Sequence, residues 1–454
     1  MRTHRLFLAS LLFGALSGAL SGTLAFAPSA SAQEAPVAPQ PGTNEGAEAL
    51  SDDLSTYVGR PAIERGIVTV APDPAGYRIS LDAAPLTSLA EGIGATFSAD
   101  PYSMLVHPQP DGTWSVSMNA PLRFDFALAL EGQAQSASYD YGMMDFSGVF
   151  SPELGAFLSG AGTLSGGTMT SKDAVSEMTA RFGPATYAIT GSRVGNGVVD
   201  FGTIQSLGAL NQTMRFQPDL ASPDQSVAVT FDAGSLAVEA SGRALESRAL
   251  MDLWAFAIAH AEEEKIKAAG EELRRRLAAV LPLWDDFDTR YAFRDLAIAT
   301  PVGTFRMDEI SQSVGGDGIE AAGRYRYALG YKGLSVDSPV LPAWSASLIP
   351  AEATIDIAVA DLDLDTPSRL LLDDLDVARA EPVSAATGER IAAHFAENPP
   401  RVTIEPTRLV AKDYEVTMSG EMSFGGTAPE ATLKIEAKGL DAAIRTLQEA
   451  GATD

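Results

Sequence analysis

Short segments in which apolar and polar side chains alternate are the feature that most constrains the fold of this chain. Between residues 122 and 130, Leu122, Phe124, Phe126, Leu128 and Leu130 alternate with Arg123, Asp125, Ala127 and Ala129. Such alternation puts the apolar side chains on one face of a β-strand. Similar runs, separated by Gly, Pro, Asp and Asn, fill most of residues 51–242 and 285–454. The pattern predicts an α+β fold, mostly β, with two antiparallel β-rich regions built as long meanders of a curved sheet.

One stretch, residues 243–284, breaks this pattern and is dense in the strong helix formers Ala, Leu, Glu, Lys and Arg. Its apolar residues recur at three-and-four spacing, which predicts a long amphipathic helix that joins the two β-rich regions. Gly270 is the position where this helix could divide into two packed helices. Two hypotheses stay open for the helix: it lies on a sheet, or it presents Trp254 and Phe256 to a ligand or partner.

Two segments of the C-terminal region are similar in sequence. Residues 353–363 read ATIDIAVADLD, and residues 431–441 read ATLKIEAKGLD. Each is an alternating strand that ends in Leu-Asp and precedes a helix-forming stretch. This similarity predicts a strand-to-helix repeat. The alternative is that two unrelated strands lead into helices through the same capping residues, which would give similar sequences without a repeat.

The N-terminus has the three parts of an export signal. Arg2 and Arg5 precede an apolar run from residue 6 to 26, and Ala30-Ser31-Ala32 matches a small-residue cleavage site. We therefore expect a signal peptide over residues 1–32, a flexible Pro/Gly/Ala linker over 33–50, and a periplasmic protein. The alternative is retention of the apolar run as an anchor. After cleavage, no transmembrane span is expected.

Charge and cysteine content exclude several classes of partner and chemistry. The chain has 59 acidic and 32 basic residues, a formal net charge of −27, and no cysteine. An acidic field repels nucleic acid and anionic headgroups and favours a basic partner. Without cysteine in an exported protein, the fold rests on packing alone, and thiol catalysis is excluded.

The sequence contains no recognisable catalytic, cofactor or metal motif. Asp361, Asp363 and Asp365 alternate as in a calcium loop, but Thr366 and Leu372 occupy the positions that need Gly and Glu. No Gly-x-Ser-x-Gly elbow occurs, so a non-catalytic protein without cofactor or metal is favoured. The candidate ligand or partner surface consists of apolar and aromatic residues: Phe124, Phe126, Leu128, Trp254 and Phe256.

Three segments carry a resemblance to known proteins: residues 431–447, residues 348–353, and the Leu281-Pro282 end of the expected helix. Through them the chain resembles a family of uncharacterised exported proteobacterial proteins, catalogued as a domain of unknown function. A looser likeness is to AsmA-like envelope proteins, whose β-sheet grooves are associated with lipid movement. This likeness implies a fold-level analogy, with no catalytic residues to transfer.

Three functional hypotheses follow. The first is a protein that binds a lipid or another hydrophobic envelope component in a groove between sheet and helix, because an alternating sheet must cover its apolar face. The second is an envelope-assembly scaffold that uses strand edges and an acidic surface to hold a basic envelope protein. The third is a hydrolase with a carboxylate pair.

Overall fold

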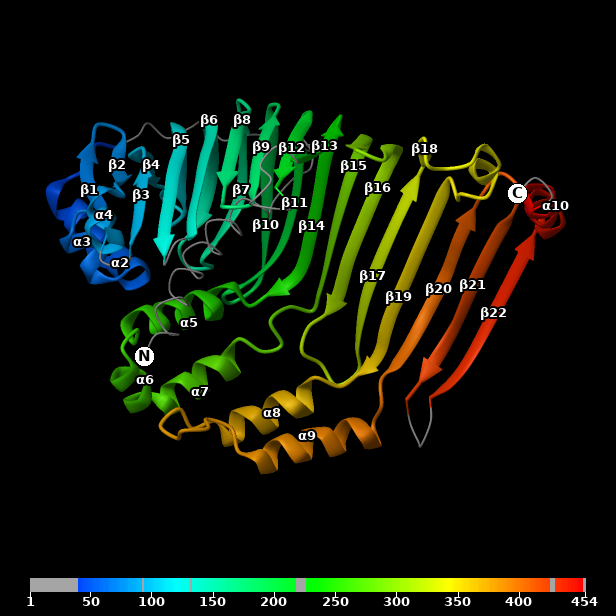
Figure 1. Cartoon of the computed structure of the whole chain (residues 1–454). Helices are drawn as coiled ribbons and strands as arrows, with labels where there is room; N and C mark the ends of the chain where they lie inside the picture. The colour runs from blue at the N-terminus through cyan, green and yellow to red at the C-terminus, as the bar shows by residue number, and fades with distance from the viewer. Residues whose placement is uncertain (1–39, 92–93, 131–132, 218–225, 425–428, 452–454) are drawn as a thin grey trace.

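The computed structural model describes residues 40–91, 94–130, 133–217, 226–424 and 429–451. Within these residues the strands form a single 22-stranded sheet in which every pairing is antiparallel (Figure 1). The predicted α+β, mostly β and antiparallel class is confirmed. The two predicted β-rich regions are, however, one sheet, because β14 (Ser235–Leu245) pairs directly with β15 (Asp286–Thr300) across the helical segment between them.

The strands run in chain order along the molecule, from one end of the sheet to the other (Figure 1). Those before β14 are β1 (Val68–Asp73), β2 (Gly76–Leu81), β3 (Ala95–Ala99), β4 (Tyr102–Pro108), β5 (Trp114–Leu130), β6 (Gln133–Ser151), β7 (Ala156–Leu164), β8 (Gly167–Lys172), β9 (Ser176–Phe182), β10 (Ala185–Gly195), β11 (Val198–Leu207), β12 (Leu210–Phe216) and β13 (Val227–Ala233). Those after β15 are β16 (Gly303–Asp317), β17 (Gly323–Lys332), β18 (Ser335–Asp337), β19 (Glu352–Leu362), β20 (Arg401–Val410), β21 (Glu415–Ser423) and β22 (Glu430–Lys438).

A line of backbone irregularities crosses the middle of the sheet. The long strands β5, β6, β15 and β16 run through it, whereas the chain between β6 and β15 forms two rows of shorter strands. One row contains β7, β10, β11 and β14, and the other contains β8, β9, β12 and β13. Left-handed residues mark the line at Gly142, Gly166, Asp295 and Gly333. Glycine adopts this conformation without the steric cost of a Cβ, so these positions let the strands change direction together.

The predicted central helix over residues 243–284 is not continuous. Arg243 to Leu245 belong to β14, and the rest divides into α5 (Ser247–Ala259), α6 (Glu263–Ala268) and α7 (Gly270–Ala279). Gly270 opens α7, as its low helix propensity predicted, and a second break falls between α5 and α6 at residues 260–262. Local propensity favoured one rod, but tertiary packing folds it: α7 returns against α5, where Arg276 lies 5.7 Å from the Phe256 ring.

The predicted flexible linker over residues 33–50 is wrong from residue 44 onward. Residues 44–58 form α2 (Asn44–Val58), with Thr43 as the N-cap whose side chain accepts a hydrogen bond from the Gly46 amide. Residues 1–39, including the expected signal peptide, lie outside the described residues. The other helical segments are α3 (Arg60–Glu64), α4 (Ala84–Glu91), η1 (Ala343–Ser347), α8 (Asp365–Asp374), α9 (Ala385–Glu397) and α10 (Leu440–Gly451).

The hydrophobic core lies at the N-terminal end of the sheet. Leu50 of α2 packs against a cluster of buried side chains from the first strands: Val68, Ile79, Val106, Val116 and Phe146. Helices α5, α7, α8 and α9 form a row along one end of the strands (Figure 1). In the described part of the chain, Leu154 and Val199 are the only large side chains with less than 2% exposure. The cluster around Leu50 therefore lies at one end of a long sheet, and Leu154 and Val199 are buried outside it.

Candidate functional site

Strand register gives the sheet one apolar face along almost its whole length. Directly opposite residues of antiparallel strands share a face, so a chain of such partners traces that face. One row runs through Met104, Met118, Phe146, Gly162, Tyr187, Gln205, Val238, Tyr291, Gln312, Leu329 and Ile355. A second row continues through Ile357, Ile404, Gly420 and Leu433. We call the surface that contains these two rows the apolar face.

Coverage of the apolar face falls from the N-terminal end to the C-terminal end. Helix α2 covers the first strands, where Val106 is 3% exposed. On β17, β19 and β22, large apolar side chains of the same face are open to solvent: Tyr327 is 41% exposed, Ile355 43%, Ile357 37%, Leu433 46% and Ile435 61%. Burying a side chain of this kind is worth roughly 1.5–3 kcal/mol. The exposed end of the face is therefore a surface that gains free energy when it is covered.

Helix α10, which follows β22 directly, also exposes its apolar side chains. Leu440, Ile444 and Leu447 recur at helical spacing and are exposed, whereas the small residues Ala443 and Ala450 are buried. An amphipathic helix normally buries its large apolar side chains. The helix thus extends the uncovered apolar surface beyond the last strand.

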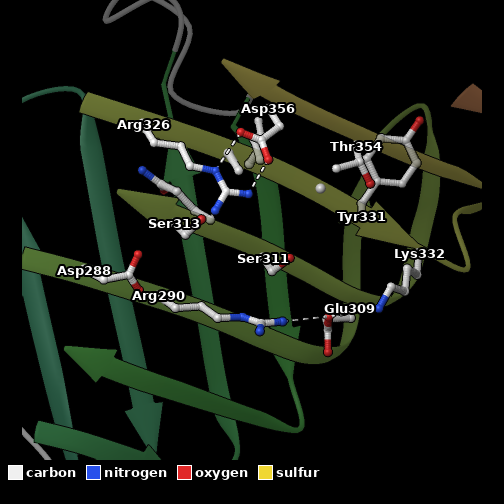
Figure 2. Close-up of a pocket in the computed structure, with 14 residues that line it drawn as sticks. Asp288, Arg290, Glu309, Ser311, Ser313, Arg326, Tyr331, Lys332, Thr354 and Asp356 are labelled. Atoms are coloured by element: carbon white, nitrogen blue, oxygen red, sulfur yellow. Dashed lines mark hydrogen bonds and ion pairs between the residues drawn. The ribbon is translucent and has the colours of Figure 1, made fainter. Parts of the chain in front are cut away.

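The opposite face of the same strands is polar and holds a pocket of about 310 Å³ (Figure 2). Small side chains, including Ser311 and Ser313, leave room on the strand surface. At one side Arg326 binds Asp356 through both carboxylate oxygens, with Nε 2.8 Å from Oδ1. At the other side Glu309 lies 3.5 Å from Lys332. The two faces of the sheet therefore differ sharply in chemistry.

Charge pairing keeps the Glu309 carboxylate of this pocket ionised. Burial tends to raise the pKa of Glu309, but Lys332 and Arg294 outweigh it and hold that pKa below its ordinary value. A hydrogen bond with Asp356 raises the pKa of Arg326. A general acid needs a carboxyl group that keeps its proton near neutral pH, so this pocket suits charge pairing better than proton transfer. Among the described residues, no group of three His, Asp or Glu side chains could hold a metal ion.

Three of the predicted surface residues share one strand, and the structure brings them together. Phe124, Phe126 and Leu128 lie on one face of β5, where Phe126 is opposite Phe97 of β3. Phe124 stacks on Tyr139 of β6 with ring centroids 4.5 Å apart. All three are half-buried. They form an aromatic cluster on the half of β5 that pairs with β3.

Trp254 and Phe256 do not join that cluster. Trp254 is exposed, but its indole N–H donates a hydrogen bond to the carbonyl of Tyr57 and so ties α5 to the end of α2. The Phe256 ring is 4% exposed and stacks on His260 at 4.0 Å. The prediction that Phe256 faces a ligand is wrong, because this ring packs between α5 and α7.

The exposed apolar residues of β17, β19 and β22 are absent from the predicted surface. The alternation at residues 353–359 and 431–437 identified these segments as strands, but every one-faced strand shows the same pattern. Exposure depends on what covers the face, and a single sequence does not carry that information.

Comparisons with protein-family models, curated proteins and solved structures gave no match to this chain. The resemblance to exported proteobacterial proteins and the likeness to AsmA-like envelope proteins remain predictions. Within the described residues, no helix combines the length and the apolar character needed to cross a bilayer.

Proposed function

We propose that this chain is a non-catalytic periplasmic protein that binds lipid acyl chains, or another hydrophobic component of the envelope, on the apolar face of its sheet. The exposure of Tyr327, Ile355, Ile357, Leu433 and Ile435 on one face carries the proposal. Contiguous exposed apolar side chains on a soluble protein mark a surface that binds a ligand, a partner or a membrane.

Two further features favour an acyl chain over a charged ligand. The apolar rows run across many strands, which suits a long flexible hydrocarbon better than a compact molecule. The net charge of −27 disfavours contact with anionic headgroups. We therefore expect the hydrocarbon to lie on the apolar face, and neutral or zwitterionic lipids to bind in preference to anionic ones.

The scaffold hypothesis is favoured by one separate observation: no strand among the described residues pairs with the outer edge of β22. The hydrolase hypothesis has less support, because Glu309 and Asp356 of the polar pocket are paired with arginine or lysine.

We also propose that the similar segments 353–363 and 431–441 form a structural repeat. In the alignment of residues 353–363 with 431–441, Asp361 corresponds to Gly439. Both residues are left-handed, with φ of 58° and 76°, and each lies where its strand leads into a helix. Ile355 and Ile357 correspond to Leu433 and Ile435, which occupy the same face of the sheet.

Lipid extraction from two matched variants tests the function. Ile355 and Thr354 are adjacent and exposed, and they lie on opposite faces of β19. Protein purified from cell envelopes should release lipid on organic extraction. We expect Ile355→Glu, which puts a carboxylate on the apolar face, to reduce the bound lipid severalfold. Thr354→Glu adds the same charge to the polar face and should retain it.

Two results would contradict the proposal. One is repeated native mass spectra that show only bare polypeptide after gentle purification. The other is an equal loss of lipid from both variants, which would point to a general effect of charge. Circular dichroism of both variants checks that the sheet is intact.

A further inference from the structure

Strand β22 has an outer edge to which no other described strand is hydrogen-bonded. It pairs with β21 through nine residues without a register shift, and every residue is exposed. Natural edge strands are usually protected by a proline, a bulge, a covering element, short length or charged side chains. Of these, β22 has only charges, which are of both signs: Glu430, Lys434, Glu436 and Lys438. The opposite end strand, β1, is shorter, includes Pro72 and packs against α2 and α3. The β22 edge has the properties of a pairing surface.

The proposed repeat shows what such an edge accepts. Strand β19, which corresponds to β22, pairs with β17 on one side and with β20 on the other. The equivalent second side of β22 is the open edge. Helix α10 packs against η1 instead. An added antiparallel strand would therefore complete the arrangement that β19 already has.

The sequence of β22 is complementary to itself in one antiparallel register. Alternate residues of a strand occupy opposite faces, and the odd-numbered residues of β22, such as Leu433 and Ile435, lie on the apolar face. A register that keeps this face continuous therefore places odd-numbered residues of the two copies opposite each other. With Ile435 opposite its own copy, Lys434 of each strand faces Glu436 of the other, and Leu433 faces Ala437. Opposite charges directly across two strands stabilise the pair.

The neighbouring registers of the same parity are less favourable. A centre at Lys434 pairs Glu430 with Lys438 and Leu433 with Ile435, but it sets Lys434 against its own copy at the axis. A centre at Glu436 sets Glu436 against its own copy and Lys434 against Lys438. A centre at Leu433 places Glu430 opposite Glu436, and a centre at Thr432 brings Pro429, which has no N–H to donate, opposite Ile435. Within one chain Lys434 and Glu436 already lie 2.7 Å apart. Two copies centred on Ile435 would therefore bring together four alternating charges.

We propose that two copies of this chain pair antiparallel through β22, with Ile435 at the two-fold axis. A two-fold axis perpendicular to the sheet leaves both apolar faces on the same side. The dimer then has one continuous apolar face that crosses the interface, and Ile435, which is 61% exposed in the single chain, packs against its own copy. This inference does not depend on the identity of any lipid.

Disulfide trapping tests the register. Because the chain has no native cysteine, only the introduced thiol can form a cross-link. Ile435→Cys places two thiols opposite each other at the axis, so mild oxidation should give a covalent dimer. Ala431→Cys places a single thiol on the same face of the same strand, far from the axis. It should stay monomeric on the same denaturing gel.

Charge-reversal variants of Lys434 and Glu436 test the same contact between the two copies without an introduced cysteine. Lys434→Glu would set two carboxylates against each other at two symmetric places, and sedimentation should show a dimer dissociation constant raised about tenfold or more. The double variant Lys434→Glu, Glu436→Lys restores opposite charges and should restore the dimer. A native chain that stays monomeric at high concentration would overturn the proposal, as would equal trapping of the two cysteine variants. Lipid retention by such a monomer would leave the proposed function intact.

Discussion

Replacing Leu154 and Leu433 by alanine, one at a time, compares the covered and the uncovered parts of this sheet. Leu154 lies between β6 and β7, is 0% exposed, and its carbonyl accepts a hydrogen bond of 2.7 Å from the Ser247 hydroxyl of α5. Leu433 lies on the apolar face of β22 and is 46% exposed. The two substitutions remove the same atoms from very different surroundings.

The expected magnitudes follow from burial. Leu→Ala at a fully buried site costs the transfer free energy of the lost atoms plus a cavity term, about 3–4 kcal/mol together for Leu154. At Leu433 roughly half of the transfer term is lost, and water fills the vacated space, so the cost is about 1 kcal/mol. The free energies of unfolding should therefore differ by about 2 kcal/mol or more.

Urea unfolding followed by circular dichroism measures both costs. Low protein concentration limits the contribution of β22 pairing. For lipid retention we expect the larger loss from Leu433→Ala, because this substitution removes contact surface from the apolar face. Leu154→Ala leaves that face unchanged and should retain the lipid. If Leu433→Ala costs as much stability as Leu154→Ala, the face is covered in solution and the basis of the proposed function is lost.

Two further predictions concern the helical segments. Ser247 is buried and donates to carbonyls in the β6–β7 and β10–β11 turns, so Ser247→Ala should lower the free energy of unfolding by about 1–3 kcal/mol, and an unchanged urea midpoint would refute this role. Hydrogen bonds from the Ser384 hydroxyl and amide hold the pKa of Asp374 well below its ordinary value. These hydrogen bonds therefore stabilise the fold fully at a pH above the ordinary pKa of Asp, and the stabilisation is lost as the pH falls through the lowered pKa of Asp374. The protection of the amides of residues 375–384, measured against their intrinsic exchange rates at each pH, should therefore fall in acid. Asp374→Asn should show low protection already at neutral pH, and protection equal to that of the unmodified chain would contradict this.

Local sequence patterns account for the individual strands in most of the sheet. Alternation at residues 122–130 predicted a one-faced strand, and β5 places Phe124, Phe126 and Leu128 on one face. Residues 109–112 include the turn formers Pro110, Asp111 and Gly112, and the β4–β5 hairpin forms around them with His107 opposite Ser115. These features depend on neighbours within a few residues, so the local pattern is sufficient to predict them.

How the segments combine depends on contacts between residues that are far apart in the chain. The helix formers of residues 243–284 favour one rod, but packing of α7 against α5 divides it, and direct pairing of β14 with β15 turns two regions into one sheet. The exposure of Ile355 and Leu433, in contrast to the burial of Val106, depends on whether a distant element such as α2 reaches the face. Alternation specifies that a strand has an apolar face, whereas long-range packing determines which part of that face is left open to a ligand.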